Sequence, residues 1–178
     1  MFRRRRNAWV EHVGRHRYAV SLGDQERALL GELVEQLRTL LEATTDDPTV
    51  RRLFPTAYNE DPDLDQAYQV LARDELLERR LAALRATTET LHDTELDLAG
   101  LSAWSATVND LRLVLGTRLD VSEEQRLPDP DDPDAPAYAV YAWLTEMLDG
   151  IIQALSDGLA DGPADDPADG LSDDGAQP

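Results

Sequence analysis

Residues 102–121 read SAWSATVNDLRLVLGTRLDV, and this stretch decides which fold class the sequence predicts. Apolar side chains recur in it at intervals of three and four positions, which is the spacing of one face of an α-helix. Thr94 and Asp97 form a capping-type pair in front of it, so we expect a helix from about Glu95 to Arg118. We expect the apolar face of this helix to point into the core; it comprises Leu101, Trp104, Val108, Leu111 and Leu115.

A second row of the same helix carries small and polar side chains, and it comprises Ser105, Asn109, Arg112 and Gly116. Two interpretations stay open for this row. Asn109 and Arg112 either tie the helix to carbonyls or carboxylates of neighbouring helices, or they form a recognition face for a partner. Asp110 belongs to another side of the helix, and Arg118 lies roughly on that side. Asn109, Asp110, Arg112 and Arg118 are therefore candidate partner-binding residues.

The segment RRLFPTAY, residues 51–58, supplies three further candidates for partner binding: Arg52, Phe54 and Tyr58. Here too the residues leave two interpretations open. Phe54, Pro55 and Tyr58 form either an exposed docking site or an ordinary packed helix end.

The N-terminal part of the chain predicts a small β-ribbon followed by an amphipathic helix. Residues 8–22 are rich in β-favouring side chains on both sides of Gly14, which indicates two short strands. Ser21 is placed to cap the next helix, with Asp24 three residues on. The apolar spacing then continues to about Ala43.

Two Asp-Pro pairs, at 47–48 and 61–62, predict the starts of further helices, because proline suits the first helical position. The first pair opens a short helix that ends before Pro55. The second opens a helical region of about 30 residues, which is long for one globular helix. We therefore expect a break near Arg73–Asp74.

The sequence thus predicts a mainly α fold: a single-domain helical bundle of five to six helices with a short N-terminal β-hairpin. Residues 1–7 are expected to form a basic disordered arm, and residues 8–157 the helical domain. Residues 127–136, with several prolines and aspartates, indicate an exposed acidic loop inside that domain. Residues 158–178 have too few apolar side chains to order and predict a disordered acidic tail.

Residues 137–156 predict a final helix with only a narrow polar stripe. Such a helix is either central to the fold or buried in an oligomer interface. We therefore expect a homodimer through its apolar face, around Tyr141, Leu144, Met147, Leu148 and Ile151.

Composition excludes several classes of chemistry. The 178 residues contain no cysteine and no lysine, so a disulfide, a thiolate nucleophile, a Schiff-base lysine and a P-loop lysine are excluded. The net charge of −19 disfavours direct binding to nucleic acid, so nucleic-acid binding through the Arg3–Arg6 arm is kept as an alternative function. No apolar run reaches the length of about 20 residues that a membrane span needs, and no signal peptide is recognisable, so a cytoplasmic protein is expected.

Catalytic and metal-binding motifs are missing from the sequence, so we expect neither an enzyme nor a cofactor. The nearest approach to a metal site is Glu89, His92 and Glu95, where Glu89 and His92 share a helix face. A di-metal bundle needs a Glu-x-x-His pair on each of two helices, and one such pair occurs here. A metal-binding bundle is thus an alternative, and no bound metal is the prediction.

Two motifs resemble those of a known family: R-L-F-P-x-A-Y and, downstream, W-x4-N-D-L-R-L-x-L-G-T-R-L. The matching positions are Arg52, Leu53, Phe54, Pro55, Ala57, Tyr58, Trp104, Asn109, Asp110, Leu111, Arg112, Leu113, Leu115, Gly116, Thr117, Arg118 and Leu119. Over residues 9–156 the chain is similar to an actinobacterial domain-of-unknown-function family of small acidic proteins, often encoded near the ClpS protease adaptor.

This resemblance implies a non-enzymatic regulatory protein that acts through a protein partner. One branch of the family is described as an oxidative-stress regulator of actinomycetes that acts with a sigma factor. A sigma factor or a protease-adaptor context is the implied partner. That branch senses oxidants through a pair of cysteines, which this chain lacks.

Overall fold

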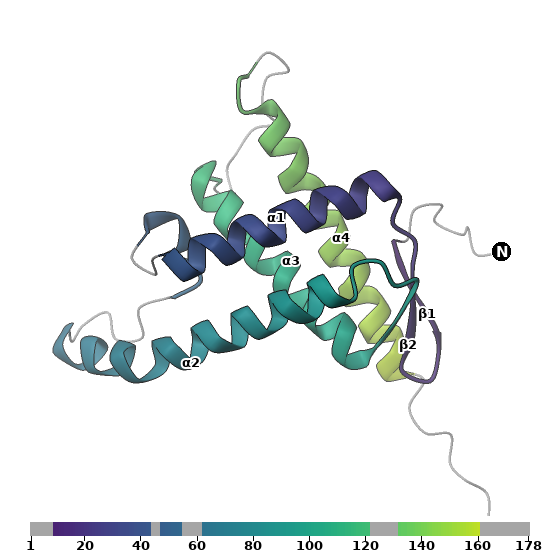
Figure 1. The fold of residues 1–178 in the computed structure, drawn as a ribbon, viewed down its shortest axis with the longest axis horizontal. Helices are drawn as coiled ribbons and strands as arrows, with labels where there is room; N and C mark the ends of the chain where they lie inside the picture. Colours follow the sequence, from purple (N-terminus) through teal and green to yellow (C-terminus); the bar gives the residue numbers. More distant parts are fainter. Residues whose placement is uncertain (1–8, 44–46, 55–61, 122–131, 161–178) are drawn as a thin grey trace, which may run out of the picture.

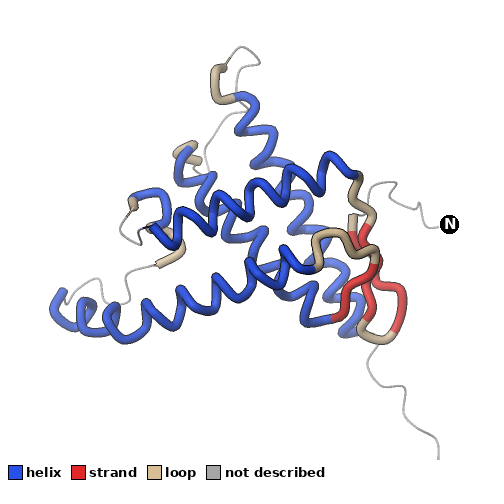
Figure 2. Tube along the Cα trace, in the orientation of Figure 1, coloured by secondary structure: helices blue, strands red, loops and turns tan. Residues whose placement is uncertain are grey.

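The computed structural model describes residues 9–43, 47–54, 62–121 and 132–160. Its elements are β1 (Val10–Gly14), β2 (Arg17–Val20), α1 (Asp24–Ala43), the 3-10 helix η1 (Pro48–Val50), α2 (Pro62–Glu89), β3 (Glu95–Asp97), α3 (Leu98–Arg118) and α4 (Ala135–Ala160). The prediction of a mainly α protein with a small N-terminal sheet is confirmed (Figures 1 and 2). The expected basic arm at 1–7, residues 161–178 of the expected tail and residues 127–131 of the expected acidic loop lie outside the described residues.

The expected count of five to six helices was wrong, because the described residues contain four α-helices and one 3-10 turn. The break expected near Arg73–Asp74 is absent, and α2 runs through it for 28 residues. Between Pro62 and Glu89 the sequence has no further proline and no glycine, so nothing interrupts the helical hydrogen bonds. At 1.5 Å per residue α2 is roughly 42 Å long, and its N-terminal part projects beyond the other helices (Figure 1).

The region before α3 forms a strand that the sequence did not predict. Residues Glu95–Asp97 pair antiparallel with β2, with Leu96 opposite Tyr18, and complete a sheet of order β1-β2-β3. The helix begins at Leu98 rather than at Glu95, and Asp97 caps it by accepting a hydrogen bond from the Gly100 N–H at 2.7 Å. A strand of three residues is too short to show the alternation of apolar and polar side chains, so the sequence gives no local signal for it. The strand forms because β2 offers a free edge with which it can pair.

We expect Asp97→Ala to lower the free energy of unfolding by about 1 kcal/mol, because it removes the side-chain acceptor at the start of α3. Urea denaturation measures this change. Asp93→Ala is the matched control, since it removes an exposed aspartate from the turn before β3 and should change stability by less than about 0.5 kcal/mol. Equal effects of the two substitutions would contradict the capping role.

The start of α1 also differs from the prediction. Helix α1 begins at Asp24, and the N–H of Gly23 donates to the Glu26 carboxylate at 2.7 Å. Ser21 therefore does not cap this helix; its N–H instead bonds the carbonyl of Trp9 at 2.8 Å and extends the pairing of the ribbon. Glu26 thus accepts from the backbone N–H just before the helix, as the glutamate of a capping box does, and satisfies one of the donors left free at the helix start.

Helix α3 is the centre of the fold, since it contacts the other three α-helices, η1, β2 and β3. In Figure 1, α1 and α2 cross in front of α3 and α4, while the sheet lies at one end of the molecule. Leu101, Trp104 and Val108 are fully buried and Leu111 nearly so, which confirms most of the predicted core face. Leu115 is half-buried instead, because it lines a pocket that opens between the helices.

Helix α4 buries the face that was expected to mediate self-association. Leu144, Met147 and Ile151 are fully inaccessible and Leu148 is buried, while Tyr141 is half-buried. Leu144, Met147, Leu148 and Ile151 therefore belong to the core of the single chain, whereas Tyr141 keeps part of its surface exposed, and the homodimer stays a prediction. The helix continues to Ala160, beyond its predicted end, and its Gly158 lies against the ring of Tyr18 in β2.

Candidate functional site

The charged pair Arg80–Asp110 joins α2 to α3 inside the core. A guanidinium N–H of Arg80 donates to the Asp110 carboxylate, and a second donates to the carbonyl of Leu53 at 2.6 Å. Asp110 is 4% exposed. Further along the same helix contact, the hydroxyls of Thr87 and Thr107 lie 2.9 Å apart. Asp110, predicted as a partner-binding candidate, is thus held inside the molecule, and Arg80 was not predicted at all.

Burial raises the pKa of the Asp110 carboxyl above its ordinary value, while the hydrogen bond and the positive charge of Arg80 act in the opposite direction. A buried carboxylate is tolerated only because that guanidinium pairs with it. The pair therefore connects three segments: α2, α3 and the turn after η1.

Phe54 belongs to the same cluster and is not an exposed docking residue. Its side chain is 8% exposed, and the guanidinium carbons of Arg73 and Arg80 lie 5.0 and 5.6 Å from its ring centroid. These distances are typical of cation–π contacts. The packed helix end is therefore the correct interpretation for Phe54, whereas Tyr58 lies outside the described residues.

Asn109 and Arg112 are half-buried on α3 and contact each other. A guanidinium N–H of Arg112 donates to the Asn109 side-chain oxygen at 3.4 Å, within one turn of the same helix. Gly116, in the same row, lies against the ring of Tyr141, and a Cβ added there would be 3.0 Å from a ring carbon. The absence of a side chain at Gly116 therefore leaves room for the ring of Tyr141, which α4 places against α3.

Arg52 and Arg118 are exposed and lie where α3 ends. Asp120 adopts a left-handed conformation after the helix, with φ of 51°, and the Val121 N–H bonds the Gly116 carbonyl at 2.8 Å. This is a Schellman-type helix end. Arg52 donates to the carbonyl of Val121 at 3.3 Å and so lies beside it. Of the described candidates, these two arginines are the ones that solvent and a partner reach most freely.

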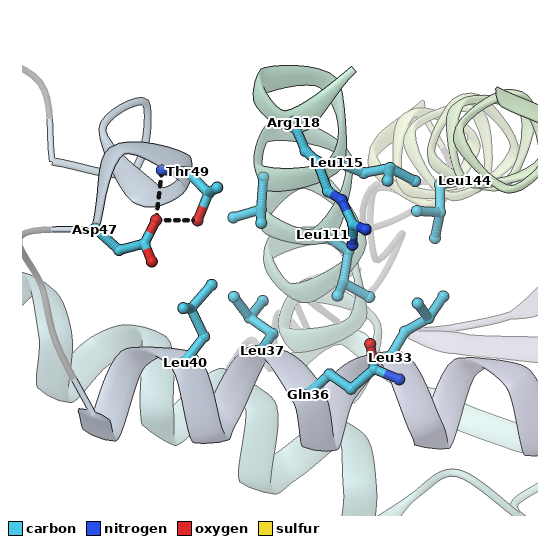
Figure 3. Close-up of a pocket in the computed structure, with 11 residues that line it drawn as sticks. Leu33, Gln36, Leu37, Leu40, Asp47, Thr49, Leu111, Leu115, Arg118 and Leu144 are labelled. Atoms are coloured by element: carbon cyan, nitrogen blue, oxygen red, sulfur yellow. Dashed lines mark hydrogen bonds between the residues drawn. The ribbon is translucent and has the colours of Figure 1, made fainter. Parts of the chain in front are cut away.

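A pocket of about 440 Å³ opens beside Arg118, between α1, η1, α3 and α4 (Figure 3). Its floor consists of the buried side chains Leu37, Leu111 and Leu144. Its walls are half-buried, which explains the partial exposure of Leu115, and its polar groups lie at the rim. The wall residues are Leu33, Leu40, Val114 and Leu115, and the rim residues are Gln36, Asp47, Thr49 and Arg118.

The rim of the pocket is electrically asymmetric. Arg118 extends over the pocket toward the part of α1 that carries Leu33 and Gln36, whereas Asp47 and Thr49 lie on the opposite side (Figure 3). The Asp47 carboxylate accepts hydrogen bonds from the Thr49 hydroxyl at 2.6 Å and the Thr49 N–H at 2.8 Å. Both bonds lower the pKa of Asp47, so that side of the rim stays negative.

Sequence reasoning missed the pocket and the partner of Asp110. The pocket depends on how α1 crosses α3, which no local pattern encodes. Arg80 did leave a signal, because it falls on the apolar spacing of α2 with Leu77, Leu84 and Leu91. A charged side chain at such a position predicts an opposite charge on a neighbouring helix.

The alternative metal site finds little support in the geometry. Within the described ranges, no three or more acidic or histidine side chains come together in an arrangement that would hold a metal ion. Glu95 faces Arg17 instead, with 3.2 Å between their charged atoms. Across the described parts of the chain, none of the helices has the length and apolar content for crossing a bilayer.

Comparison with known proteins gives one family and several relatives. The family described as "Domain of unknown function (DUF2017)" matches residues 2–155. The "Oxidative stress regulator AosR" of Mycobacterium tuberculosis is 33% identical over 129 residues, which cover 61% of this chain and 58% of that protein. The "Putative oxidative stress regulator AosR" of Mycobacterium leprae is 32% identical over 129 residues, covering 62% and 59%. The match thus spans less than two thirds of these relatives, and no solved structure matches the chain.

Proposed function

The chain belongs to the DUF2017 family, and from this premise we propose that it is a non-enzymatic regulatory protein of the oxidative-stress response that acts by binding a protein partner. The observation that carries the proposal is the likeness, over 129 residues, to proteins named oxidative stress regulators. A component of the transcription machinery, such as a sigma factor, is the partner we propose, and the cytoplasm is the place where the two would meet.

The surface proposed for the partner lies at the end of α3 and on the turn after η1. Arg51, Arg52 and Arg118 are exposed there, on a chain whose net charge is −19. Exposed guanidinium groups on an otherwise acidic molecule favour a partner that brings carboxylates to this place. Asn109 and Arg112 belong to the proposal as half-buried residues of the same helix, with a positioning role.

Purified sigma factors from the organism that encodes this chain provide the direct test. We expect one of them to bind, and Arg52→Ala to weaken that binding about tenfold or more, because interface arginines often carry a large share of the binding energy. Isothermal titration measures the dissociation constants. Arg112→Ala should weaken binding less, since its side chain is half-buried beside Asn109.

Arg85→Ala is the matched control, because it removes an exposed arginine from α2 and the same unit of charge. The control should bind as the unchanged chain does. If no sigma factor binds, the proposed partner is wrong. If one binds and Arg52→Ala and Arg85→Ala have equal effects, the proposed surface is wrong.

A further inference from the structure

We propose that the pocket beside α3 binds a small amphiphilic carboxylate, with its apolar chain against the leucines and its carboxylate on Arg118. This inference goes beyond the regulatory role, because it concerns a ligand of the isolated chain. It rests on the shape of the pocket, on the placement of its polar groups and on the charge balance of its rim.

The shape fits a small molecule. The volume of about 440 Å³ lies within the range of roughly 300–1,000 Å³ that is typical of small-ligand sites. Such sites are mostly apolar and have a few well-placed polar groups. Here seven leucine and valine side chains, from α1, α3 and α4, form the floor and walls, and four residues carry the polar atoms.

The polar groups define one end for an anion. The guanidinium of Arg118 reaches over the opening toward Gln36, and no ion pair of Arg118 with another described residue occupies it (Figure 3). Its planar set of N–H donors matches the two oxygens of a carboxylate. The amide of Gln36 supplies a further donor on the same side of the pocket.

The opposite side of the rim repels an anion. Asp47 remains ionised there, because Thr49 donates two hydrogen bonds to its carboxylate. A ligand carboxylate is therefore directed to the Arg118 side, and the apolar chain extends toward Leu37 and Leu40. One guanidinium and one carboxylate also make the rim neutral overall, which suits a monoanion better than a phosphate dianion.

The net charge of the whole chain cannot cause a carboxylate to bind here. The chain carries a net charge of −19 and repels anions as a whole. Tight binding of a carboxylate would thus report a local arrangement, and the proposed arrangement is the one at Arg118.

Titration of the full chain with decanoate, below the concentration at which it forms micelles, tests the proposal. We expect saturable binding of one molecule, with amide chemical-shift changes centred on the residues that line the pocket. Arg118→Gln should weaken binding about tenfold or more, because it removes a charge-assisted hydrogen bond. Decanol, which lacks the charge, should bind the unchanged chain about tenfold more weakly than decanoate, and decyl phosphate more weakly as well.

Two variants distinguish binding in the pocket from binding elsewhere on the surface. Val114→Phe places a ring in the pocket wall and leaves Arg118 intact, so it should abolish binding while the circular dichroism and the melting temperature stay close to those of the unchanged chain. Arg85→Gln removes the same charge from α2 and should leave decanoate binding unchanged.

The proposal is overturned if decanoate shows no saturable binding, if decanol binds as tightly as decanoate, or if Arg118→Gln and Arg85→Gln have equal effects. Because this experiment contains no protein partner, its failure leaves the proposed regulatory function in place. Failure of the sigma-factor experiment would equally leave the ligand site in place.

Discussion

Arg80→Met is expected to lower the free energy of unfolding by about 3–5 kcal/mol at pH 8, because it leaves the buried carboxylate of Asp110 without its cation. Methionine keeps most of the length and apolar volume of the side chain, so the loss reports the charge and its hydrogen bonds. Domains of this size have a total stability of about 5–15 kcal/mol, so a large part would be lost. Urea denaturation measures the difference.

The expected loss depends on pH in a defined direction. The pKa of Asp110 is raised in the folded chain above its ordinary value of 3.8, so the folded state favours the neutral carboxyl. The stability that this group contributes is present below the pKa of the unfolded chain and is lost as the pH rises through the folded pKa. Without Arg80 the folded pKa rises further, so Arg80→Met should cost less at pH 5 than at pH 8.

The double variant Arg80→Met/Asp110→Leu supplies the control. It removes both charges, and we expect it to be more stable than Arg80→Met alone, because no buried charge remains unpaired. A double variant whose loss of stability equals the sum of the losses in Arg80→Met and in Asp110→Leu alone would show that the pair is not coupled.

Trp104→Ala should lower the free energy of unfolding by about 3–5 kcal/mol, through the cavity that it leaves in the centre of the fold. Trp104 is fully buried on α3, and its indole N–H donates to the Thr90 hydroxyl at 2.9 Å. The hydroxyl also donates to the carbonyl of Ala86 at 2.8 Å, so part of its hydrogen bonding survives the substitution. Thermal and urea denaturation measure the effect.

Trp104→Phe separates the cavity from the hydrogen bond. It retains an aromatic ring and removes the indole N–H, so we expect a smaller loss, between about 1 and 3 kcal/mol. Equal losses for alanine and phenylalanine would place the energy in the hydrogen bond rather than in packing.

The part of the fold that periodicity encodes could be predicted from the sequence. The apolar face of α3 was expected in the core, and Trp104 and Val108 lie there. Apolar residues spaced three and four positions apart all fall on one face of a helix, so their burial follows from the sequence. The expected break in α2 failed for a complementary reason. It rested on typical helix length alone, whereas the local residues around Arg73 favour helix throughout.

The candidate site was harder to predict, because it depends on which helices meet. Asp110 was correctly placed away from the Asn109 row, but its cation is 30 residues earlier in the sequence, on α2. The sequence is compatible with both an exposed and a packed Phe54, because it does not show whether other side chains cover an aromatic ring at a helix end. The pocket beside Arg118 arises from the crossing of α1 and α3, and only the three-dimensional arrangement reveals it.

The contact between the two ends of the described chain has a consequence for biosynthesis. Gly158, near the end of α4, lies against Tyr18 of β2, and β1 also packs on α4. The ribosome makes the ribbon first and α4 more than a hundred residues later. The sheet β1-β2-β3 is therefore complete in the growing chain before the helix that contacts Tyr18 and packs on β1 has been made. A nascent chain halted before α4 would leave Tyr18 without its contact to Gly158 and β1 without the helix that packs on it.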